Sequence, residues 1–253
     1  MYQEERRQAI AELVRRDGRG DVAELATRFT VTQETVRRDL IDLERRGVLR
    51  RFHGGAMPVE RLRSEPAVAE KARLMADQKH RVATAALDYL PRTGSILLDA
   101  GTTTGALAGL IPTDRELTVV TNSVPIAMNL SARQNLNLLL VGGRVRGRTL
   151  ATVDDWAQRA LSDLVVDVAF IATNGVSVEH GLSTPDLAEA AAKRAMVAVG
   201  RRVVLVADHT KIGEDHFARF ADVSDIDVFI TDRGVSPAAV ASFEHAGLEV
   251  VVA

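Results

Sequence analysis

The sequence of 253 residues predicts an α/β protein with two domains, a helical head with a β-wing over residues 1–57 and an α/β body over residues 76–253. Three observations lead to this prediction. Apolar residues recur at helical spacing in the head, short β-branched or leucine-rich runs alternate with helical stretches in the body, and a charged linker, residues 58–75, separates the two. A chain of this length is long enough for one small and one medium domain.

The first two helices of the head are expected to be short and amphipathic. The first carries Ile10, Leu13 and Val14 on one face. Asp21 precedes the second helix, and Glu24 follows at the spacing of a capping box, a pattern typical of a helix start.

A third helix is expected between Thr32, a good N-cap, and Gly47, a good residue for a helix end. Within it, Val36, Leu40 and Leu43 recur at i, i+4 and i+7 and form one apolar stripe. The opposite face is polar and cationic. Three short helices with a brief connection between the last two match the helix-turn-helix plan.

A wing is expected after the third helix. Residues 48–52 have the composition of a strand, and residues 53–55 that of a turn. In a winged helix-turn-helix domain, the first turns of the last helix read base edges in DNA. Base contacts are therefore expected from Gln33, Glu34, Thr35 and Arg37, and phosphate contacts from Arg38, Arg51 and His53, with Thr32 and Gly54 beside them.

The arginines of the third helix have a second interpretation, as the solvated face of an ordinary amphipathic helix with Arg38 paired to Asp42 at i+4. The charge distribution favours DNA binding, because residues 1–57 hold 12 arginines, no lysine and 10 acids, a net +2, whereas the remainder carries a net −4. Arginine is also suited to bidentate contacts with guanine and phosphate. Since the whole chain has a net charge of −2, DNA affinity is expected to depend on local geometry and on dimerisation.

The composition excludes several classes of protein. No run approaches the ~18 uncharged apolar residues of a membrane span, and residues 1–7 lack the apolar segment of a signal peptide, so a cytoplasmic protein is expected. The chain has no cysteine and its six histidines lack paired ligand spacing, so neither a metal nor a cofactor is expected. Trp156, the only tryptophan, is expected in the core or at an interface.

Seven short strands and several helices are expected in the body. The strands are predicted over residues 95–99, 117–122, 136–141, 165–172, 203–207, 227–231 and 248–252. Helices are predicted over residues 106–111, 124–133, 154–164, 186–199 and 236–246. Alternating strands and helices imply a parallel sheet covered on both faces.

Polar residues follow the expected strands at their carboxyl ends, where open α/β sheets bind ligands. Residues 99–105 form a glycine- and threonine-rich turn before a helix, and the N–H groups of such a helix start bind anions, although the threonines could instead merely cap the helix. Four other strand ends are also polar, residues 121–123, 142–144, 173–175 and 208–211. Five such turns on one side are hard to explain by packing alone. Glu189 and Lys193, at i and i+4, are either a surface pair or a lysine placed at a phosphate.

Together these motifs resemble those of the DeoR/GlpR family of bacterial transcription regulators. The head has that family's Thr-Val-Arg-Arg-Asp-Leu core at residues 35–40 and its His-Gly-Gly wing at residues 53–55. From about residue 76 the body has its Asp-x-Gly-Thr-Thr, Thr-Asn, Gly-Gly, Asn-Gly, Glu-Ala-x-x-Lys and Asp-x-x-Lys elements in the expected order. The resemblance covers nearly the whole chain and implies a repressor that binds double-stranded operator DNA as a homodimer or homotetramer.

The resemblance also implies a sensor domain related in fold to ribose-5-phosphate isomerase, which binds a phosphorylated sugar. By this analogy the phosphate would be held by Asp99, Gly101, Thr102, Thr103 and Thr104, with charge from Lys193 and Lys211. The sugar would be lined by Asn122, Gly143, Arg144, Asn174 and Gly175. Residues 173–175 and 180–186 resemble regulators of phosphotransferase uptake and fructose use, which implies a fructose phosphate as effector. Two residues depart from the family pattern, because Asn174 stands where Asp is frequent and Asp154 where Gly is common.

The isomerase-like fold raises the alternative of a sugar-phosphate isomerase with a DNA-binding head. Proton abstraction beside a carbonyl needs a positioned carboxylate base, which Asn174 cannot supply, while Asp99, Glu189 and Asp208 remain possible bases. A binding protein is therefore expected and not an enzyme. A third class, an interaction module without a small ligand, would not need so many Gly, Thr and Asn residues at strand ends.

Overall fold

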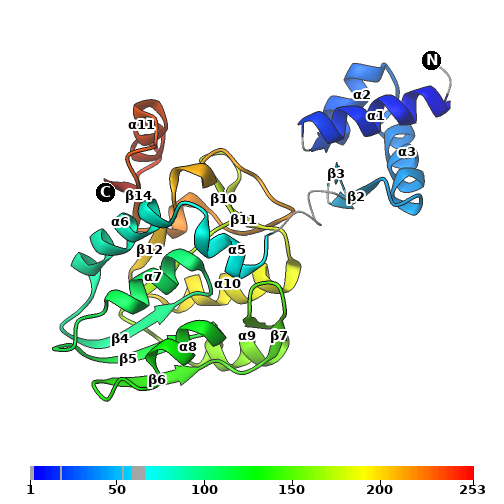
Figure 1. The fold of residues 1–253 in the computed structure, drawn as a ribbon. Helices are drawn as coiled ribbons and strands as arrows, with labels where there is room; N and C mark the ends of the chain where they lie inside the picture. Colours follow the sequence, from blue (N-terminus) through cyan, green and yellow to red (C-terminus); the bar gives the residue numbers. More distant parts are fainter. Residues whose placement is uncertain (1–2, 18, 53, 59–65) are drawn as a thin grey trace. The chain divides into compact units, whose positions relative to one another are not determined.

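The computed structural model describes residues 3–17, 19–52, 54–58 and 66–253, which form two compact units, the second beginning at Pro66. The described residues of the first unit form three helices and a three-stranded antiparallel sheet in the order β1-β3-β2 (Figure 1). Its elements are α1 (Gln3–Asp17), β1 (Gly20–Asp21), α2 (Val22–Phe29), α3 (Gln33–Arg45), β2 (Leu49–Phe52) and β3 (Gly55–Pro58). This arrangement is the predicted winged helix-turn-helix.

The second helix begins, and the third helix both begins and ends, where the sequence predicts. The Asp21 carboxylate accepts two backbone N–H groups of the first turn of α2, at 2.7 and 3.3 Å. Thr32 Oγ1 accepts the backbone N–H of Thr35 at 3.2 Å and caps α3. Beyond α3, Gly47 has a φ of +69°, the left-handed conformation that commonly follows a helix.

The apolar stripe of α3 packs into the core of the first unit. Val36, Leu40 and Leu43 are buried together with Ile10 and Val14 of α1. Burying one such side chain stabilises a fold by about 1.5–3 kcal/mol. The stripe therefore holds α3 with its polar face outward.

The wing is a hairpin in which Phe52 of β2 is paired with Gly55 of β3. The carbonyl oxygen of Gly54, in the turn, accepts the backbone N–H of Val22 at 2.8 Å and so joins the wing to α2. The sequence predicts β2 and the turn but neither β1 nor β3, because strands of two and four residues carry little periodic signal. His53 lies outside the described residues.

The second unit is built on a seven-stranded sheet in the order β15-β14-β12-β9-β4-β5-β6, with every neighbouring pair parallel. Its strands are β4 (Thr93–Leu98), β5 (Glu116–Thr121), β6 (Leu136–Leu140), β9 (Val168–Ile171), β12 (Val203–Val206), β14 (Val228–Thr231) and β15 (Glu249–Val252). The seven predicted strands are confirmed. Every residue of β9, β12 and β14 is buried, which is why these strands are apolar runs without alternation.

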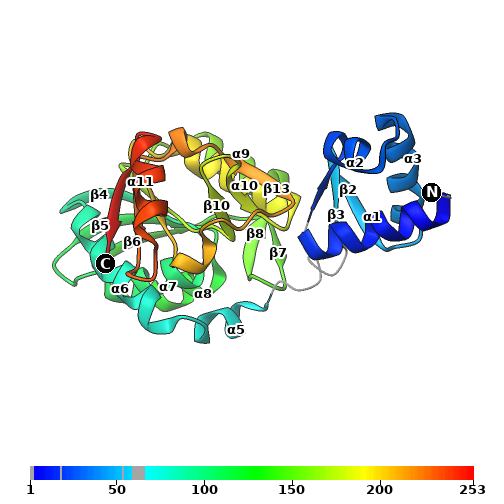
Figure 2. The same cartoon turned by 90° about the horizontal axis from the view of Figure 1, so that it is seen from above.

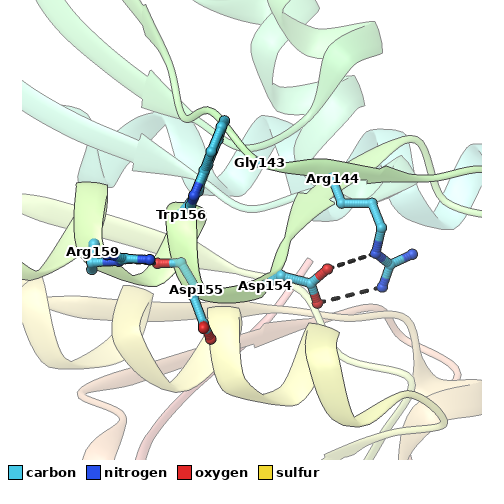
Figure 3. A pocket seen from close by; sticks show the side chains of 6 residues that line it. All are labelled: Gly143, Arg144, Asp154, Asp155, Trp156 and Arg159. Carbon is cyan, nitrogen blue, oxygen red and sulfur yellow. Dashed lines mark hydrogen bonds and ion pairs between the residues drawn. The ribbon is translucent and has the colours of Figure 1, made fainter.

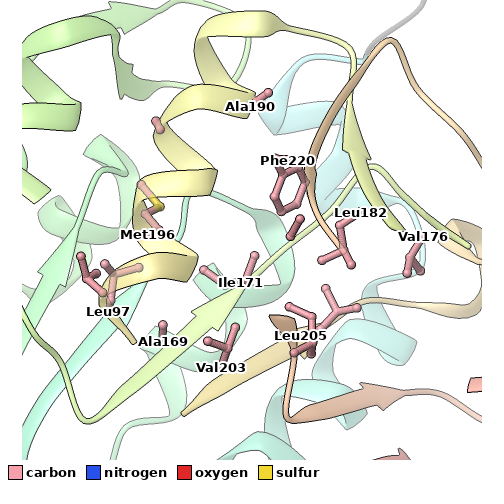
Figure 4. Close-up of a cluster of buried hydrophobic side chains, with 14 of the residues drawn as sticks. Leu97, Ala169, Ile171, Val176, Leu182, Ala190, Met196, Val203, Leu205 and Phe220 are labelled. Carbon is pink, nitrogen blue, oxygen red and sulfur yellow. The ribbon is translucent and has the colours of Figure 1, made fainter. Parts of the chain in front are cut away.

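Helices cover both faces of this sheet (Figure 2). One face carries α6 (Ala76–Ala86), α7 (Thr102–Leu110) and α8 (Val124–Leu130), and the other carries α9 (Asp154–Ser162), α10 (Leu187–Val199) and α11 (Pro237–His245). Each face has its own apolar core, and Figure 4 shows the one that includes Met196 of α10 and Ile171 of β9. Among the described residues, no helix is both long enough and apolar enough to cross a membrane.

Two small antiparallel sheets were not predicted. One pairs β7 (Arg144–Arg146) with β8 (Ala151–Val153), and the other joins β10 (Gly175–Ser177), β11 (Gly181–Thr184) and β13 (Ala218–Ala221). Three 3-10 turns are also present, η1 (Leu87–Tyr89), η2 (His209–Lys211) and η3 (Val223–Asp225). The small sheets follow the carboxyl ends of β6, β9 and β12 in the chain, so they belong to the side of the sheet where such folds bind ligands.

A short helix, α5 (Val68–Arg73), lies within the segment expected as a linker but packs with the second unit. The backbone N–H of Val68 donates to the carbonyl oxygen of Arg148 at 2.9 Å. Lys79 Nζ of α6 donates to the carbonyl oxygens of Lys71 and Leu74 at 2.5 and 2.6 Å. Both ends of α5 are therefore attached to the body.

Candidate functional site

The polar face of α3 is exposed at its first turns. Arg37 Nη2 donates to Gln33 Oε1 at 3.2 Å, and Arg37 and Arg38 each lie 3.7 Å from the Glu34 carboxylate. Their side chains are 53% and 76% exposed, and ion pairs of this kind contribute less than about 1 kcal/mol. Asp42, the alternative partner of Arg38, pairs with two other arginines of the head at 2.9 and 2.7 Å. A phosphate or a base can therefore displace Glu34 from both arginines at little cost.

Other predicted DNA contacts have structural partners within the head. The hydroxyl groups of Thr32 and Thr35 lie 2.9 Å apart in the cap of α3. The backbone N–H and Nε of Arg51 donate to the Glu44 carboxylate at 3.0 and 2.8 Å. Arg51 therefore fixes the wing against α3 before any DNA is bound.

A buried ion cluster behind α3 was missed by the sequence-based prediction. The Asp39 carboxylate is fully buried and accepts Nε of Arg6 at 2.6 Å and Nε of Arg7 at 3.0 Å. The sequence did indicate that Asp39 is buried, because Asp39 is at i+3 from Val36 and therefore lies on the same helix face as the apolar stripe. The cluster ties α1 to α3 and so sets the orientation of the exposed arginines.

In the body, a buried ion pair lies at the carboxyl end of β4. Asp99 Oδ2 pairs with Lys193 Nζ of α10 and also accepts the backbone N–H of Ala172 at 3.0 Å. Lys193 Nζ donates to the Ala172 carbonyl at 2.9 Å and lies 5.5 Å from the centre of the Phe220 ring. The other oxygen of the carboxylate, Asp99 Oδ1, is buried and has no hydrogen-bond partner among the described residues. It is an unused acceptor in a buried polar site.

The turn after Asp99 leads into the amino end of α7. Gly101 is the N-cap, and the described residues supply no side-chain cap. Thr104 Oγ1 donates backwards to the carbonyl oxygens of Asp99 at 2.6 Å and Gly101 at 3.0 Å, while Thr103 is buried and Thr102 half-buried. The interpretation of the threonines as simple caps is therefore wrong, and the first N–H groups of α7 form an uncapped helix start of the kind that binds anions.

Asn122 lies beside this turn and holds it in place. Its Oδ1 accepts the backbone N–H of Ala100 at 2.9 Å, and its Nδ2 donates to the carbonyl oxygen of Thr152 at 3.1 Å. The side chain is 2% exposed. Asn122 therefore connects the turn after β4 to β8.

Asn174 and Glu189 belong to a second polar network at the same side of the sheet. Thr184 Oγ1 lies 3.1 Å from Asn174 Oδ1 and 3.2 Å from Glu189 Oε2. Glu189 Oε1 accepts Nη1 of Arg146 at 3.2 Å. Because Glu189 is buried and Lys193 pairs elsewhere, the interpretation of these two as a surface pair is wrong.

Gly143 and Gly175 are required by close packing. A Cβ on Gly143 would lie 2.6 Å from the carbonyl oxygen of Val153, and one on Gly175 would lie 2.1 Å from that of Glu214. Any larger residue would displace backbone next to the two polar networks.

The turn after β12 holds Asp208, which is buried, and Lys211, which is half-buried. The sequence-based prediction missed Asp232, at the end of β14, which contacts this turn. Asp232 accepts the backbone N–H of His209 at 2.8 Å and contacts Nδ1 of the His209 ring at 3.0 Å. Burial raises the pKa of Asp232, but hydrogen bonds from the backbone of His209 and Gly234 and from the His209 ring outweigh it, so the pKa lies below its usual value. Within the described part of the chain, no group of three or more His, Cys, Asp or Glu residues could hold a metal.

Arg144 lies in a separate pocket beside α9 (Figure 3). The pocket is lined by Gly143, Arg144, Asp154, Asp155, Trp156 and Arg159. Arg144 donates to the Asp154 carboxylate at 2.6 and 3.4 Å. Asp154 has a φ of +77°, a backbone conformation that favours glycine. Trp156 is 72% exposed, so of its two expected positions, in the core or at an interface, the core is wrong.

Two family models match the chain. A DeoR-like helix-turn-helix domain matches residues 6–61, and a DeoR C terminal sensor domain matches residues 74–233. The two matches lie in the same order as the two units of the structure.

Full-length relatives are also found. The chain is 37% identical to the HTH-type transcriptional regulator GlpR of Haloferax volcanii, over 99% of this chain and 98% of that one. It is 29% identical to the glycerol-3-phosphate regulon repressor of Escherichia coli, over 99% and 100%. Among solved structures it is similar to ribose 5-phosphate isomerase A of Methanocaldococcus jannaschii, with a TM-score of 0.41, 15% identity and 55% of each chain covered. By its family matches and its relatives, the chain belongs to the DeoR family of DNA-binding transcription regulators.

Proposed function

We propose that this chain represses genes of sugar uptake or catabolism, binding operator DNA as a homodimer or homotetramer and releasing it when a phosphorylated sugar occupies the body. One observation carries the proposal: the same chain combines an exposed cationic α3 with a buried polar site at the carboxyl end of a parallel sheet. The first feature suits DNA and the second suits a small anionic ligand.

In the head, Arg37 reads base edges and Arg38 contacts phosphate. Gln33 and Arg37 are hydrogen-bonded side by side on the first turns of α3, which are the turns that face bases in this motif. Arg38 is more exposed and reaches outward. The remaining contacts that we propose are Thr32, Glu34, Thr35, Arg51, His53 and Gly54.

In the body, the phosphate of the effector binds at the start of α7. The uncapped N–H groups of residues 102–104 and the helix dipole attract an anion there. Lys193 neutralises Asp99, so the site carries no net negative charge from that residue, and Lys211 adds a positive charge. Asp99 Oδ1, buried and unpartnered among the described residues, then accepts a ligand hydroxyl.

A fructose phosphate is the effector that we propose, on the motifs at residues 173–175 and 180–186. Its hydroxyl groups would meet the polar network of Asn174 and Glu189, which already contains one donor cation, Arg146. Asn122 and Gly175 complete the proposed lining, whereas Arg144, which lies with Gly143 in the separate pocket beside α9, is not part of it.

The signal reaches the head through the start of α5. Val68 is hydrogen-bonded to Arg148, and the next residue, Thr149, donates its hydroxyl to Glu189. A ligand that contacts Glu189 therefore acts on the loop that holds α5. Coupling of this kind typically amounts to about 1–3 kcal/mol.

Fluorescence anisotropy of the full chain on DNA from its own upstream region, at fixed salt, tests the proposal. Fructose 1-phosphate, fructose 6-phosphate, glycerol 3-phosphate, free fructose and inorganic phosphate are added in turn. Selective release by a fructose phosphate is expected, and Lys211→Met should weaken that release without changing DNA affinity in its absence. DNA binding that ignores every compound would contradict the sensor, and the absence of specific DNA binding would contradict the regulator and favour the isomerase-like enzyme.

A further inference from the structure

Large apolar side chains are exposed around one edge of the seven-stranded sheet. We call this surface the β6 edge patch, and its members are Met128 of α8, Leu139 and Leu140 of β6, Val145 of β7 and Trp156 of α9. Met128 and Trp156 are 73% and 72% exposed. α8 packs on β6 and α9 packs on β7, and β7 begins only four residues after the end of β6, so the elements that carry the five side chains adjoin one another. Exposed apolar surface of this density marks an interaction site.

The strand at the centre of the patch is an edge that nothing in its sequence protects. Within the described residues, β6 pairs only with β5, and residues 136–140, Leu-Asn-Leu-Leu-Leu, contain neither charge nor proline. Natural proteins usually protect such an edge with lysine, proline or a bulge. An unprotected apolar edge strand is suited to pairing with another strand.

The opposite edge of the same sheet, β15, is different. Glu249 of this strand pairs with Arg202 at 3.4 Å and accepts a hydrogen bond from the Tyr89 hydroxyl at 2.7 Å. The Arg202 guanidinium also stacks 4.8 Å from the centre of the Tyr89 ring. This edge therefore carries the polar protection that β6 lacks.

The charged side chains next to the β6 edge patch include as many acids as arginines, so two copies of this surface can pair opposite charges. Trp156 lies on α9 with Asp155 and Arg159, and the pocket that these residues line also contains the Arg144–Asp154 pair (Figure 3). The pocket therefore holds two acids and two arginines beside one exposed tryptophan. A two-fold axis brings the same surface against itself, so acids of one copy can face arginines of the other.

We propose that the β6 edge patch is the surface by which the body binds a second copy of this chain, with the two β6 strands antiparallel about a two-fold axis. Antiparallel pairing of identical strands satisfies the unpaired backbone groups of both edges at once, and Trp156 and Met128 then fill the flanks as buried anchors. This interface rests on the proposed function, in which the repressor is a homodimer or homotetramer, and it assigns the surface that joins two of the subunits.

Sedimentation equilibrium of the full chain without DNA tests the surface. Leu140→Lys combined with Trp156→Ala should raise the dissociation constant of the assembly by about 100-fold or more, because it charges the shared edge and removes an anchor. The mass should fall to half that of the unsubstituted chain. Val252→Lys, at the 44% exposed Val252 of the other edge strand, is the matched control and should leave the mass unchanged. An unchanged mass in the double variant, or a monomeric unsubstituted chain, overturns the proposal.

Cross-linking gives an independent result, because the chain has no cysteine of its own. Leu140→Cys should give a covalent dimer with a short bismaleimide, whereas Val252→Cys should not. The reverse pattern would also overturn the proposal. Neither measurement uses DNA or effector, so failure of this interface is distinguishable from failure of the proposed regulation.

Discussion

The cations on the exposed face of α3 and the lysine at the buried site of the body are held in opposite ways. Arg37 and Arg38 of the head are more than half exposed, and their ion pairs with Glu34 are 3.7 Å long. Lys193 of the body is 6% exposed and contacts Asp99, the Ala172 carbonyl and the Phe220 ring. The first arrangement leaves charge available to a partner molecule, whereas the second uses charge inside the fold.

This difference predicts which property each residue controls. An exposed ion pair contributes little to stability, so its loss should be visible mainly in binding. A buried ion pair leaves an uncompensated charge when one partner is removed, so its loss should be visible mainly in stability. The four predictions below test that division, from the largest effect to the smallest.

The largest effect is expected at the buried pair in the body. Lys193→Met should lower the free energy of unfolding by about 3–5 kcal/mol, because Asp99 would remain buried without its cation. Urea unfolding followed by circular dichroism measures the loss. Lys211→Met removes a half-buried lysine from the same side of the sheet and should cost less than about 1 kcal/mol. Equal losses in the two variants would break the comparison.

Within the head, the same division should separate two acids of α3. Asp39→Ala leaves Arg6 and Arg7 without their buried carboxylate and should destabilise the head by about 2–3 kcal/mol. Glu34→Ala, at a side chain that is 63% exposed, should change stability by less than about 1 kcal/mol. Hydrogen exchange of the α3 amides resolves the head from the body. Similar protection in both variants would contradict the structural role of Asp39.

The fold could be predicted from the sequence where burial leaves a continuous signal. The parallel strand β12, Val203–Val206, is covered on both faces, so its sequence is an apolar run that needs no knowledge of its neighbours. β11 is only four residues long, and it is defined by pairing with β13 across a register shift at Leu182 and Ser183. Such a strand depends on contacts distant in sequence, which a local pattern does not contain.

The candidate site divides in the same way. The turn at residues 99–105 was predictable because one local segment holds all of its polar groups. That Lys193 reaches Asp99 depends on the packing of α10 against β9, the strand beside β4, and the two residues are 94 positions apart in the sequence. Asp39 was missed for a different reason. A charged residue is usually exposed, whereas the helical spacing of Asp39 places it on the buried face of α3.

The exposed arginines should control binding and not stability. Arg37→Ala should weaken operator binding by about 1–3 kcal/mol and relax base preference, while Arg38→Ala should weaken binding evenly across sequences and reduce the salt slope by about one. Anisotropy titrations at several salt concentrations separate the two effects. Equally tight and equally selective binding by the Arg37 variant would show that bases are read elsewhere.

The smallest effect is expected at the contact between Asp232 and His209. The exposed fraction of His209, 29%, lies between that of Lys193 and those of Arg37 and Arg38. Hydrogen bonds from His209 and Gly234 hold the pKa of Asp232 below its usual value against the opposing effect of burial, so folding favours the carboxylate. Because folding lowers the pKa of Asp232, its stabilisation of the fold is fully present above the pKa of an unfolded aspartate, about 3.9. The stabilisation is lost as the pH falls through the lower pKa of the folded state. Asp232→Asn should therefore cost about 1 kcal/mol at neutral pH, and the difference from the unsubstituted chain should shrink on acidification. Urea unfolding at a series of pH values between neutral and acidic measures it. If the difference in free energy of unfolding between the two chains stays constant over that range, the charge of the Asp232 carboxylate does not stabilise the contact with His209. His209 would then not be an intermediate between the exposed and the buried cations.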